Sequence, residues 1–160
     1  GLNTFGYVGG RPITNIDPFG LASWEGTQTT IAVVYGGGAV RYKFNLESKC
    51  VNGKKGKAEV VAGGPAVGLG LTASGSYSLS VEFEDELTDV DPYVFGGSAK
   101  FVNASYAVGF AGYSYQAIQL GGAKAIGGGY QFGYDASIHG GAGISTVVSA
   151  SIEECGCPSN

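Results

Sequence analysis

The residues best suited to chemistry are one histidine and the carboxylate that precedes it. His139 is the only histidine of the chain, and Asp135 lies four residues before it among several serines. Positions four apart on a strand face the same side, so this spacing predicts a carboxylate–imidazole pair of the kind that activates a serine hydroxyl. No G-x-S-x-G element presents a nucleophile, however, and Gly140-Gly141 indicates a hairpin end. Asp135 and His139 are therefore kept as the site of an alternative, enzymatic function.

Metal and nucleotide sites are not predicted. The acidic run EFEDELTDVDP (82–92) offers several carboxylates for calcium, but it lacks the glycine and the spacing of an EF-hand loop. We interpret it as a solvated loop. The glycine-rich stretches 63–70 and 127–133 contain neither G-x-G-x-x-G before a helix nor the G-K-[ST] of a phosphate loop. The sequence thus predicts no metal and no cofactor.

Three cysteines point to one cross-link. Cys155 and Cys157 are separated by a single residue, which is too short for a C-x-x-C metal or redox site. We expect a disulfide from Cys50 to either Cys155 or Cys157, which would tie the C-terminal segment to the turn near residue 50. Closing a loop of about 105 residues in this way would contribute on the order of 4–5 kcal/mol and would indicate an oxidising compartment.

The first twenty-one residues carry a more specific pattern. In Asp17-Pro18-Phe19-Gly20-Leu21, the proline fixes the backbone of a turn and the glycine tolerates positive φ. With the residues before it, this segment resembles the end of an RHS-repeat-associated core domain, whose last repeat reads roughly Y-x-x-N/G-x-P-x-x-x-x-D-P-x-G-L. The matching positions are Tyr7, Gly9, Gly10, Pro12, Asp17, Pro18, Gly20 and Leu21.

The resemblance implies a boundary within a longer protein. In that family the segment closes a large β-cage, and a variable cargo, usually a secreted toxin, follows it. Residues 1–21 would then be a remnant of the RHS core, and residues 22–160 the C-terminal effector domain. The family aspartate that matches Asp17 works with a second acidic residue, from an upstream D-P-x-G copy, to cut after the leucine. No such copy precedes Asp17 here, so we expect Asp17 to be inactive and the Leu21–Ala22 bond to be cut only in the parent.

The resemblance also implies the setting in which the domain acts. It indicates a bacterial protein that is secreted or delivered into a target cell during interbacterial competition. The expected partners are the RHS cage of the parent chain and an immunity protein. No apolar run approaches the roughly 20 residues of a membrane helix, and no cleavable signal pattern opens the sequence. Transport is therefore expected to depend on the parent.

Charge argues against nucleic acid as a target. The net charge is −4, whereas a nucleic-acid-binding surface needs a basic stripe to neutralise phosphates. The one basic cluster surrounds the turn Asn52-Gly53. It consists of Lys49, Lys54, Lys55 and Lys57. We interpret this cluster as a solvated hairpin end and exclude a nuclease.

The sequence predicts that the chain, including the candidate site residues, is built from β-strands. The chain has 30 glycines and only 14% charged residues, against an average of about 25%. Val40, Tyr42, Phe44 and Leu46 alternate with polar residues, and Asn52-Gly53 is a strong hairpin signal. The predicted strands are 27–35, 40–46, 58–62, 67–73, 77–83, 98–103, 105–111, 113–120, 127–136 and 143–152. Glycines within strands permit sharp bending. The pattern predicts a compact, glycine-rich antiparallel β-barrel, with a β-sandwich as the alternative.

Aromatic residues crowd the second half of the chain. They are Tyr106, Phe110, Tyr113, Tyr115, Tyr130, Phe132 and Tyr134. We favour a place in the barrel core, with two alternatives: the outer face of a membrane barrel, or a barrel mouth that binds lipid or another ligand. Titratable residues are few and no catalytic motif is present. We therefore predict a non-enzymatic effector that binds a partner, a lipid or a membrane, with an enzymatic toxin around Asp135 and His139 as the alternative.

Overall fold

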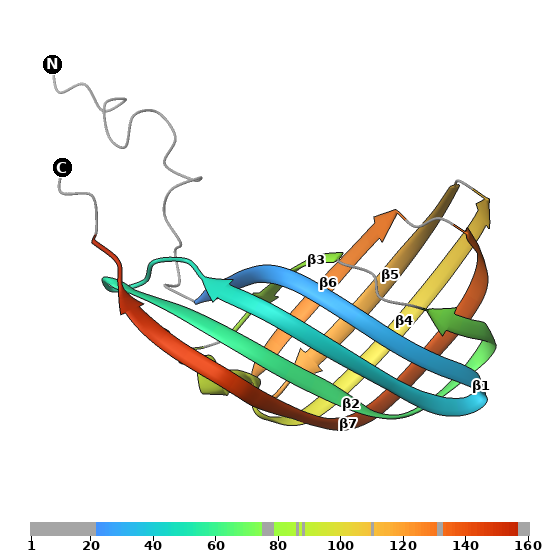
Figure 1. The fold of residues 1–160 in the computed structure, drawn as a ribbon, viewed down its shortest axis with the longest axis horizontal. Coiled ribbons are helices and arrows are strands. Elements are labelled where there is room, and N and C mark those ends of the chain that lie inside the picture. The colour runs from blue at the N-terminus through green and yellow to red at the C-terminus, as the bar shows by residue number, and fades with distance from the viewer. Residues whose placement is uncertain are drawn as a thin grey trace, which may run out of the picture.

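The computed structural model is a closed antiparallel β-barrel (Figure 1). It describes residues 22–74, 79–85, 87, 89–109, 111–130 and 133–156, so the motif of residues 1–21 and Cys157 lie outside the described part. The elements are β1 (Ser23–Ser48), β2 (Lys54–Ser74), β3 (Leu79–Glu84), the 3-10 helix η2 (Pro92–Phe95), β4 (Gly97–Gly109), β5 (Ala111–Leu120), β6 (Ala123–Tyr130) and β7 (Gly133–Glu154). Around the wall the strands follow the order β1-β2-β7-β4-β5-β6-β3. The prediction of a barrel is confirmed.

Strand β1 folds back on itself and so provides two neighbouring arms of the wall. Gly36 has a φ of +72°, and the backbone N–H of Lys49 donates to the carbonyl of Ser23 at 3.0 Å. Figure 1 shows the blue outgoing arm (23–34) beside the blue-green returning arm (38–48). β3 pairs with the outgoing arm, and β2 pairs mainly with the returning arm. This reversal is necessary, because seven elements that are all paired antiparallel could not otherwise close into a ring.

β2, β4 and β7 are longer than the sequence predicts, and the predicted strands 58–62 and 67–73 merge into β2. The predicted strands 98–103 and 105–111 merge into β4, and the predicted strand 143–152 is the second half of β7. The hairpin end predicted at Gly140-Gly141 is wrong, because these glycines lie in the middle of β7. At Gly141 a side chain would lie 2.7 Å from the ring of Phe101. Glycine is present there because a Cβ would also collide with the backbone carbonyl oxygen of Pro65 on the neighbouring strand β2, and no turn is involved.

One end of the barrel is closed by aromatic side chains, and we call it the base. The base region comprises residues 22–26, 41–61, 79–101, 117–125 and 144–156. Trp24 packs edge-on against Phe95 of η2 at a centroid distance of 5.1 Å, and Phe83 packs against Phe95 at 5.5 Å. Phe44 contacts Phe83 at 5.4 Å, and its ring is fully buried. The hydrophobic core therefore fills this end.

The opposite end is the tip, where β1 turns back. The tip region comprises the described residues of the ranges 27–40, 62–74, 102–116 and 126–143. β4 ends there, and β5 and β7 begin there. Among the described residues, no helix has the length and apolar character needed to cross a membrane.

Candidate functional site

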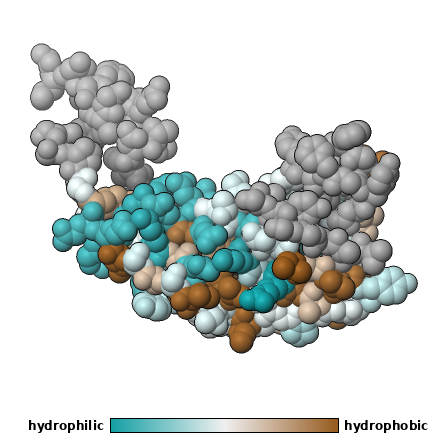
Figure 2. Space-filling view, viewed as in Figure 1, coloured by the Kyte–Doolittle hydropathy of each residue, from teal (hydrophilic) through white to brown (hydrophobic). Residues whose placement is uncertain are grey.

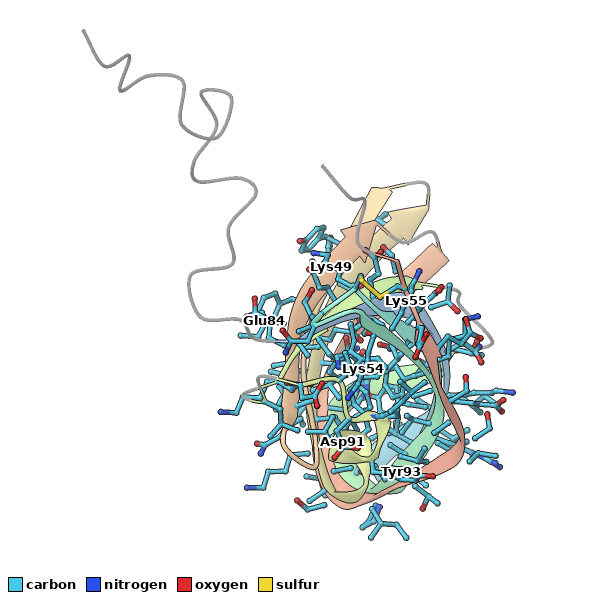
Figure 3. The ribbon with its side chains drawn as sticks, turned by 90° about the vertical axis from the view of Figure 1, so that its left-hand side faces the viewer. Lys49, Lys54, Lys55, Glu84, Asp91 and Tyr93 are labelled. Atoms are coloured by element: carbon cyan, nitrogen blue, oxygen red, sulfur yellow. A yellow bond between two sulfur atoms is a disulfide. The ribbon has the colours of Figure 1, made fainter. Side chains whose placement is uncertain are left out.

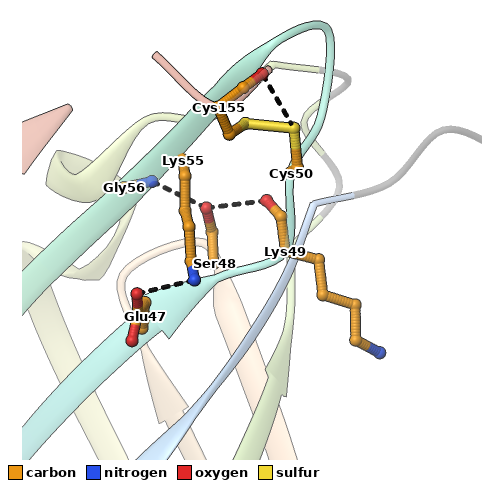
Figure 4. Close-up of a disulfide and its surroundings, with 7 residues drawn as sticks. All are labelled: Glu47, Ser48, Lys49, Cys50, Lys55, Gly56 and Cys155. Carbon is orange, nitrogen blue, oxygen red and sulfur yellow. Dashed lines mark hydrogen bonds and ion pairs between the residues drawn. A yellow bond between two sulfur atoms is a disulfide. The ribbon is translucent and has the colours of Figure 1, made fainter. Parts of the chain in front are cut away.

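The predicted cross-link forms between Cys50 and Cys155, with their Cα atoms 6.1 Å apart (Figure 4). It joins the β1–β2 turn to the end of β7, and the N–H of Cys155 donates to the carbonyl of Gly53 at 2.9 Å. Asn52 and Gly53 have φ values of 52° and 77°, which confirms the predicted hairpin. The disulfide therefore fastens the base end of the barrel.

The lysine cluster lies at the same end (Figure 3), and each of its members has a carboxylate partner. The nitrogen–oxygen distances are 3.5 Å for Lys49–Glu82, 3.4 Å for Lys54–Asp89, 2.7 Å for Lys55–Glu47 and 3.0 Å for Lys57–Glu153. The hydrogen bond from Lys55 lowers the pKa of Glu47, and the hydrogen bond to Glu153 raises the pKa of Lys57. Both pairs are exposed and contribute little to stability. Each lysine of the cluster is thus paired with a carboxylate of the described residues.

One residue of the acidic run departs from its predicted role. Asp85 was expected in a solvated loop, but its side chain is buried in the base. The indole N–H of Trp24 donates to one carboxylate oxygen at 2.9 Å, and the N–H of Leu87 donates to the other at 2.9 Å. Burial raises the pKa of Asp85, while these two hydrogen bonds oppose the shift. Asp85 therefore fixes the loop after β3 to the aromatic core.

Asp135 and His139 both lie on β7, in register with Ala107 and Asn103 of β4. Residues of a strand rise about 3.3 Å each, so these two positions are about 13 Å apart, too far for a direct hydrogen bond. The imidazole of His139 is buried inside the barrel, with 4% of its surface exposed. The side chain of Asp135 is outside the described part, and the enzymatic alternative stays a prediction. Among the described residues, no three histidine, cysteine, aspartate or glutamate side chains are grouped as metal ligands.

The barrel interior changes character between base and tip. In the tip region the buried side chains include glutamines, serines and a histidine. Gln28 and Gln116 exchange two hydrogen bonds of 2.9 Å, and the hydroxyls of Ser105 and Ser137 are 2.9 Å apart. The glutamine pair joins β1 to β5 across the interior, and the serine pair joins the neighbouring strands β4 and β7. Among the described side chains, the inside of the tip thus holds no acidic residue, lysine or arginine, and its polar groups lie beside buried apolar ones, namely Ala32, Val34, Val40, Ala62 and Ala66.

The outer surface of the tip has the opposite character. Large apolar side chains and tyrosines there are exposed by 49–79%. We call this set the apolar collar: Ile31, Val33, Tyr35, Val67, Leu69, Val102, Tyr106, Val108, Tyr113, Tyr115, Ile126 and Ile138. Six of the seven strands contribute to the collar. In Figure 2, hydrophilic residues gather toward the base, and hydrophobic and neutral residues cover much of the remaining described surface.

Charge follows the same division. Asp135 is the only charged residue in the sequence of the tip region, whereas the base region holds every lysine and Arg41. The core placement favoured for the tyrosines is wrong for Tyr106, Tyr113 and Tyr115, which point outward. Alternation in the sequence could not decide this, because it gives the period of a strand and not which face is inside. The sequence feature that indicates an apolar outer surface is the near absence of charged residues from the tip region.

The fold and its surface define a glycine-rich antiparallel β-barrel with two chemically different ends. No known family model, curated protein sequence or solved structure gave a significant match to the chain.

Proposed function

We propose that the chain is the C-terminal effector domain of an RHS-type polymorphic toxin, and that it acts without catalysis by inserting the tip region into a lipid bilayer. The observation that carries this proposal is the outer surface of the tip, whose described side chains are apolar and uncharged while glutamines, serines and a histidine are buried inside beside alanines and valines. Barrels that meet lipid have this arrangement, because outward residues replace contacts with water by contacts with acyl chains. The RHS context is supported by the sequence motif that ends at Leu21.

The length of the uncharged strands sets the depth of insertion. The uncharged part of β4, residues 102–109, extends about 26 Å at about 3.3 Å per residue. Tilted by about 40°, as strands in membrane barrels are, it reaches about 20 Å. The hydrocarbon core is about 30 Å thick, so one chain would enter the bilayer without crossing it completely. The paired lysines and carboxylates of the base would remain in water.

Flotation of the full chain with phospholipid vesicles tests this proposal. A lysine placed in the collar would cost about 2–4 kcal/mol if it must enter hydrocarbon. We therefore expect Val33→Lys, at a side chain 67% exposed, to reduce vesicle binding at least tenfold. Ile152→Lys is the matched control, since Ile152 is 52% exposed but lies at the base. Equal effects of the two substitutions, or no vesicle binding by the unmodified chain, would contradict the proposal.

Expression in a sensitive cell separates this function from the enzymatic alternative. Membrane action predicts that Val33→Lys abolishes toxicity and that His139→Gln preserves it. The opposite result, with toxicity lost in His139→Gln and retained without vesicle binding, would favour an enzyme around Asp135 and His139.

A further inference from the structure

A shallow groove of about 330 Å³ crosses the outer face of β1, β2 and β7 at the boundary between tip and base. In the strand register, Arg41 lies opposite Gly63, and Gly63 lies opposite Ile144. Gly63 has no side chain to fill this row, so Arg41 and Ile144 stand on the two sides of a gap. Val61 and Thr146 line the end of the groove that is nearer to the base. The walls are therefore mainly apolar, with one guanidinium at the rim.

The close approach of β1 and β2 explains the glycine. A side chain on Gly63 would place its Cβ 2.6 Å from the carbonyl oxygen of Val40. Any larger residue would push the two strands apart. The groove is thus a fixed consequence of strand packing and does not depend on a mobile side chain.

The cations beside the groove differ from the other cations of the base. Lys43 and the four lysines of the β1–β2 turn cluster each form an ion pair. Arg41 and Lys100 are exposed, and neither forms an ion pair with another described residue. Lys100 lies opposite Ala142, one outward-facing position along β7 from Ile144. Among the described residues, Arg41 at the rim of the groove and Lys100 on β4, the strand beyond β7, therefore have no carboxylate partner.

Both cations also lie at the edge of the uncharged tip. Arg41 directly follows the uncharged stretch 27–40, and Lys100 precedes the uncharged part of β4 with Phe101 between them. When the tip enters a bilayer, this level coincides with the headgroups, where cationic side chains meet phosphates. The carboxylates Glu47 and Glu59 nearest to this face are already paired with lysines.

We propose that this groove binds an anionic phospholipid. Arg41 would contact the headgroup phosphate of the lipid in the groove, Lys100 would contact headgroup phosphate beside it on β4, and Val61 and Ile144 would contact the upper part of an acyl chain. A guanidinium suits this role, because its fixed donors match phosphate oxygens in pairs. The inference rests on the proposed membrane function and adds lipid selectivity to it. A local site is required, since the net charge of −4 would otherwise repel an anionic membrane.

Binding of the full chain to two kinds of vesicle tests the inference. One kind contains phosphatidylcholine alone, and the other contains phosphatidylcholine with phosphatidylglycerol. We expect tighter binding to the anionic vesicles, and a loss of about fivefold for Arg41→Gln or Lys100→Gln, from the roughly 1 kcal/mol expected for each cation near a charged surface. Binding to neutral vesicles should stay unchanged in both variants. Raised salt should weaken the anionic preference.

Lys57→Gln is the matched control, because it removes the same charge at a lysine that is paired with Glu153. It should change anionic binding by less than twofold. Equal binding to both vesicle kinds, or an equal loss in Lys57→Gln, would overturn the lipid selectivity and leave the proposed insertion standing. A chain that binds neither kind of vesicle would overturn both. Far-ultraviolet circular dichroism of each variant confirms that the barrel is intact.

Discussion

The base and the tip are built from the same strands, but polar side chains are buried mainly in the tip. In the base half of the returning arm of β1, Tyr42 and Phe44 point inward and are buried, while Arg41 and Lys43 face water. In the tip half of β4, Ser105 points inward, and Val102 and Tyr106 face outward. A strand alternates strictly, so either face can be the apolar one. The difference shows that one barrel can combine a water-facing end with an end suited to lipid.

The largest expected change in stability comes from removing a buried aromatic ring of the base, compared with an exposed apolar side chain of the tip. Phe44→Ala removes a fully buried ring from the aromatic cluster and should lower the free energy of unfolding by about 3–5 kcal/mol. Val33→Ala on the outgoing arm of β1 should change it by less than about 0.5 kcal/mol. Urea unfolding without lipid measures both. Similar losses in the two variants would mean that the collar is packed against protein in solution.

The disulfide should contribute nearly as much to the base. Replacing both Cys50 and Cys155 by alanine should lower the free energy of unfolding by about 4 kcal/mol, because the unfolded chain loses a cross-link over 105 residues. Vesicle binding by the folded fraction should be unchanged, since the tip contains neither residue. Loss of binding by a variant that remains folded would show that the two ends are coupled.

A pH titration tests the buried carboxylate of the base. Burial raises the pKa of Asp85 above its ordinary value of 3.8, so the folded state holds this proton more tightly than the unfolded state. The contribution of Asp85 to stability should therefore grow as pH falls through its raised pKa, and it should be least favourable above that pKa.

Asp85→Asn removes this titration and is its control. Asparagine can accept the indole N–H of Trp24, but its amide cannot also accept from the N–H of Leu87. We expect a loss of about 1–3 kcal/mol at neutral pH and a flatter pH dependence than that of the unmodified chain. An unchanged difference between the two proteins at all pH values would contradict this role.

The smallest effect concerns the polar interior of the tip. Gln28→Leu alone leaves the amide of Gln116 buried without its partner and should cost about 1–3 kcal/mol. Replacing both glutamines by leucine should be close to neutral for stability, because neither position then holds a buried amide without a hydrogen-bond partner. Urea unfolding of the single and double variants gives the coupling between them. Additive losses would mean that the two amides do not depend on each other.

The sequence predicts much of the base. The alternation of Val40, Tyr42, Phe44 and Leu46, the turn at Asn52-Gly53 and a disulfide involving Cys50 are all local or chemically restricted features, and the structure confirms each of them. The choice between Cys155 and Cys157 needed the register of β7 against β2. The burial of Asp85 was not predictable, because its partner Trp24 lies 61 residues away in the sequence.

For the strands of the tip, the sequence does not determine which face lies inside the barrel. Tyr113 and Tyr115 alternate with Ser114 and Gln116, a pattern that fits an apolar core as well as an apolar exterior. Gly140-Gly141 is ambiguous in a similar way, because the sequence alone does not distinguish a glycine required in a strand by residues of the adjacent strands from a glycine required in a turn. Only the close approach of Pro65 and Phe101, on the two strands that neighbour β7, shows why residue 141 must be small.

The sequence by itself determined an all-β chain, the spacing of its strands, the separation of charge from residues 27–40, 102–116 and most of 126–143, and the RHS-like motif that ends at Leu21. Tertiary structure decided which face of each strand is inside, since that depends on barrel closure and on the reversal of β1. It also decided that Arg41, Gly63 and Ile144 lie in one row, because the register joins three strands that are distant in the chain. The local sequence pattern determines the alternation of side chains along a strand. Which face lies inside, and which residues of different strands become neighbours, is determined only when the barrel closes.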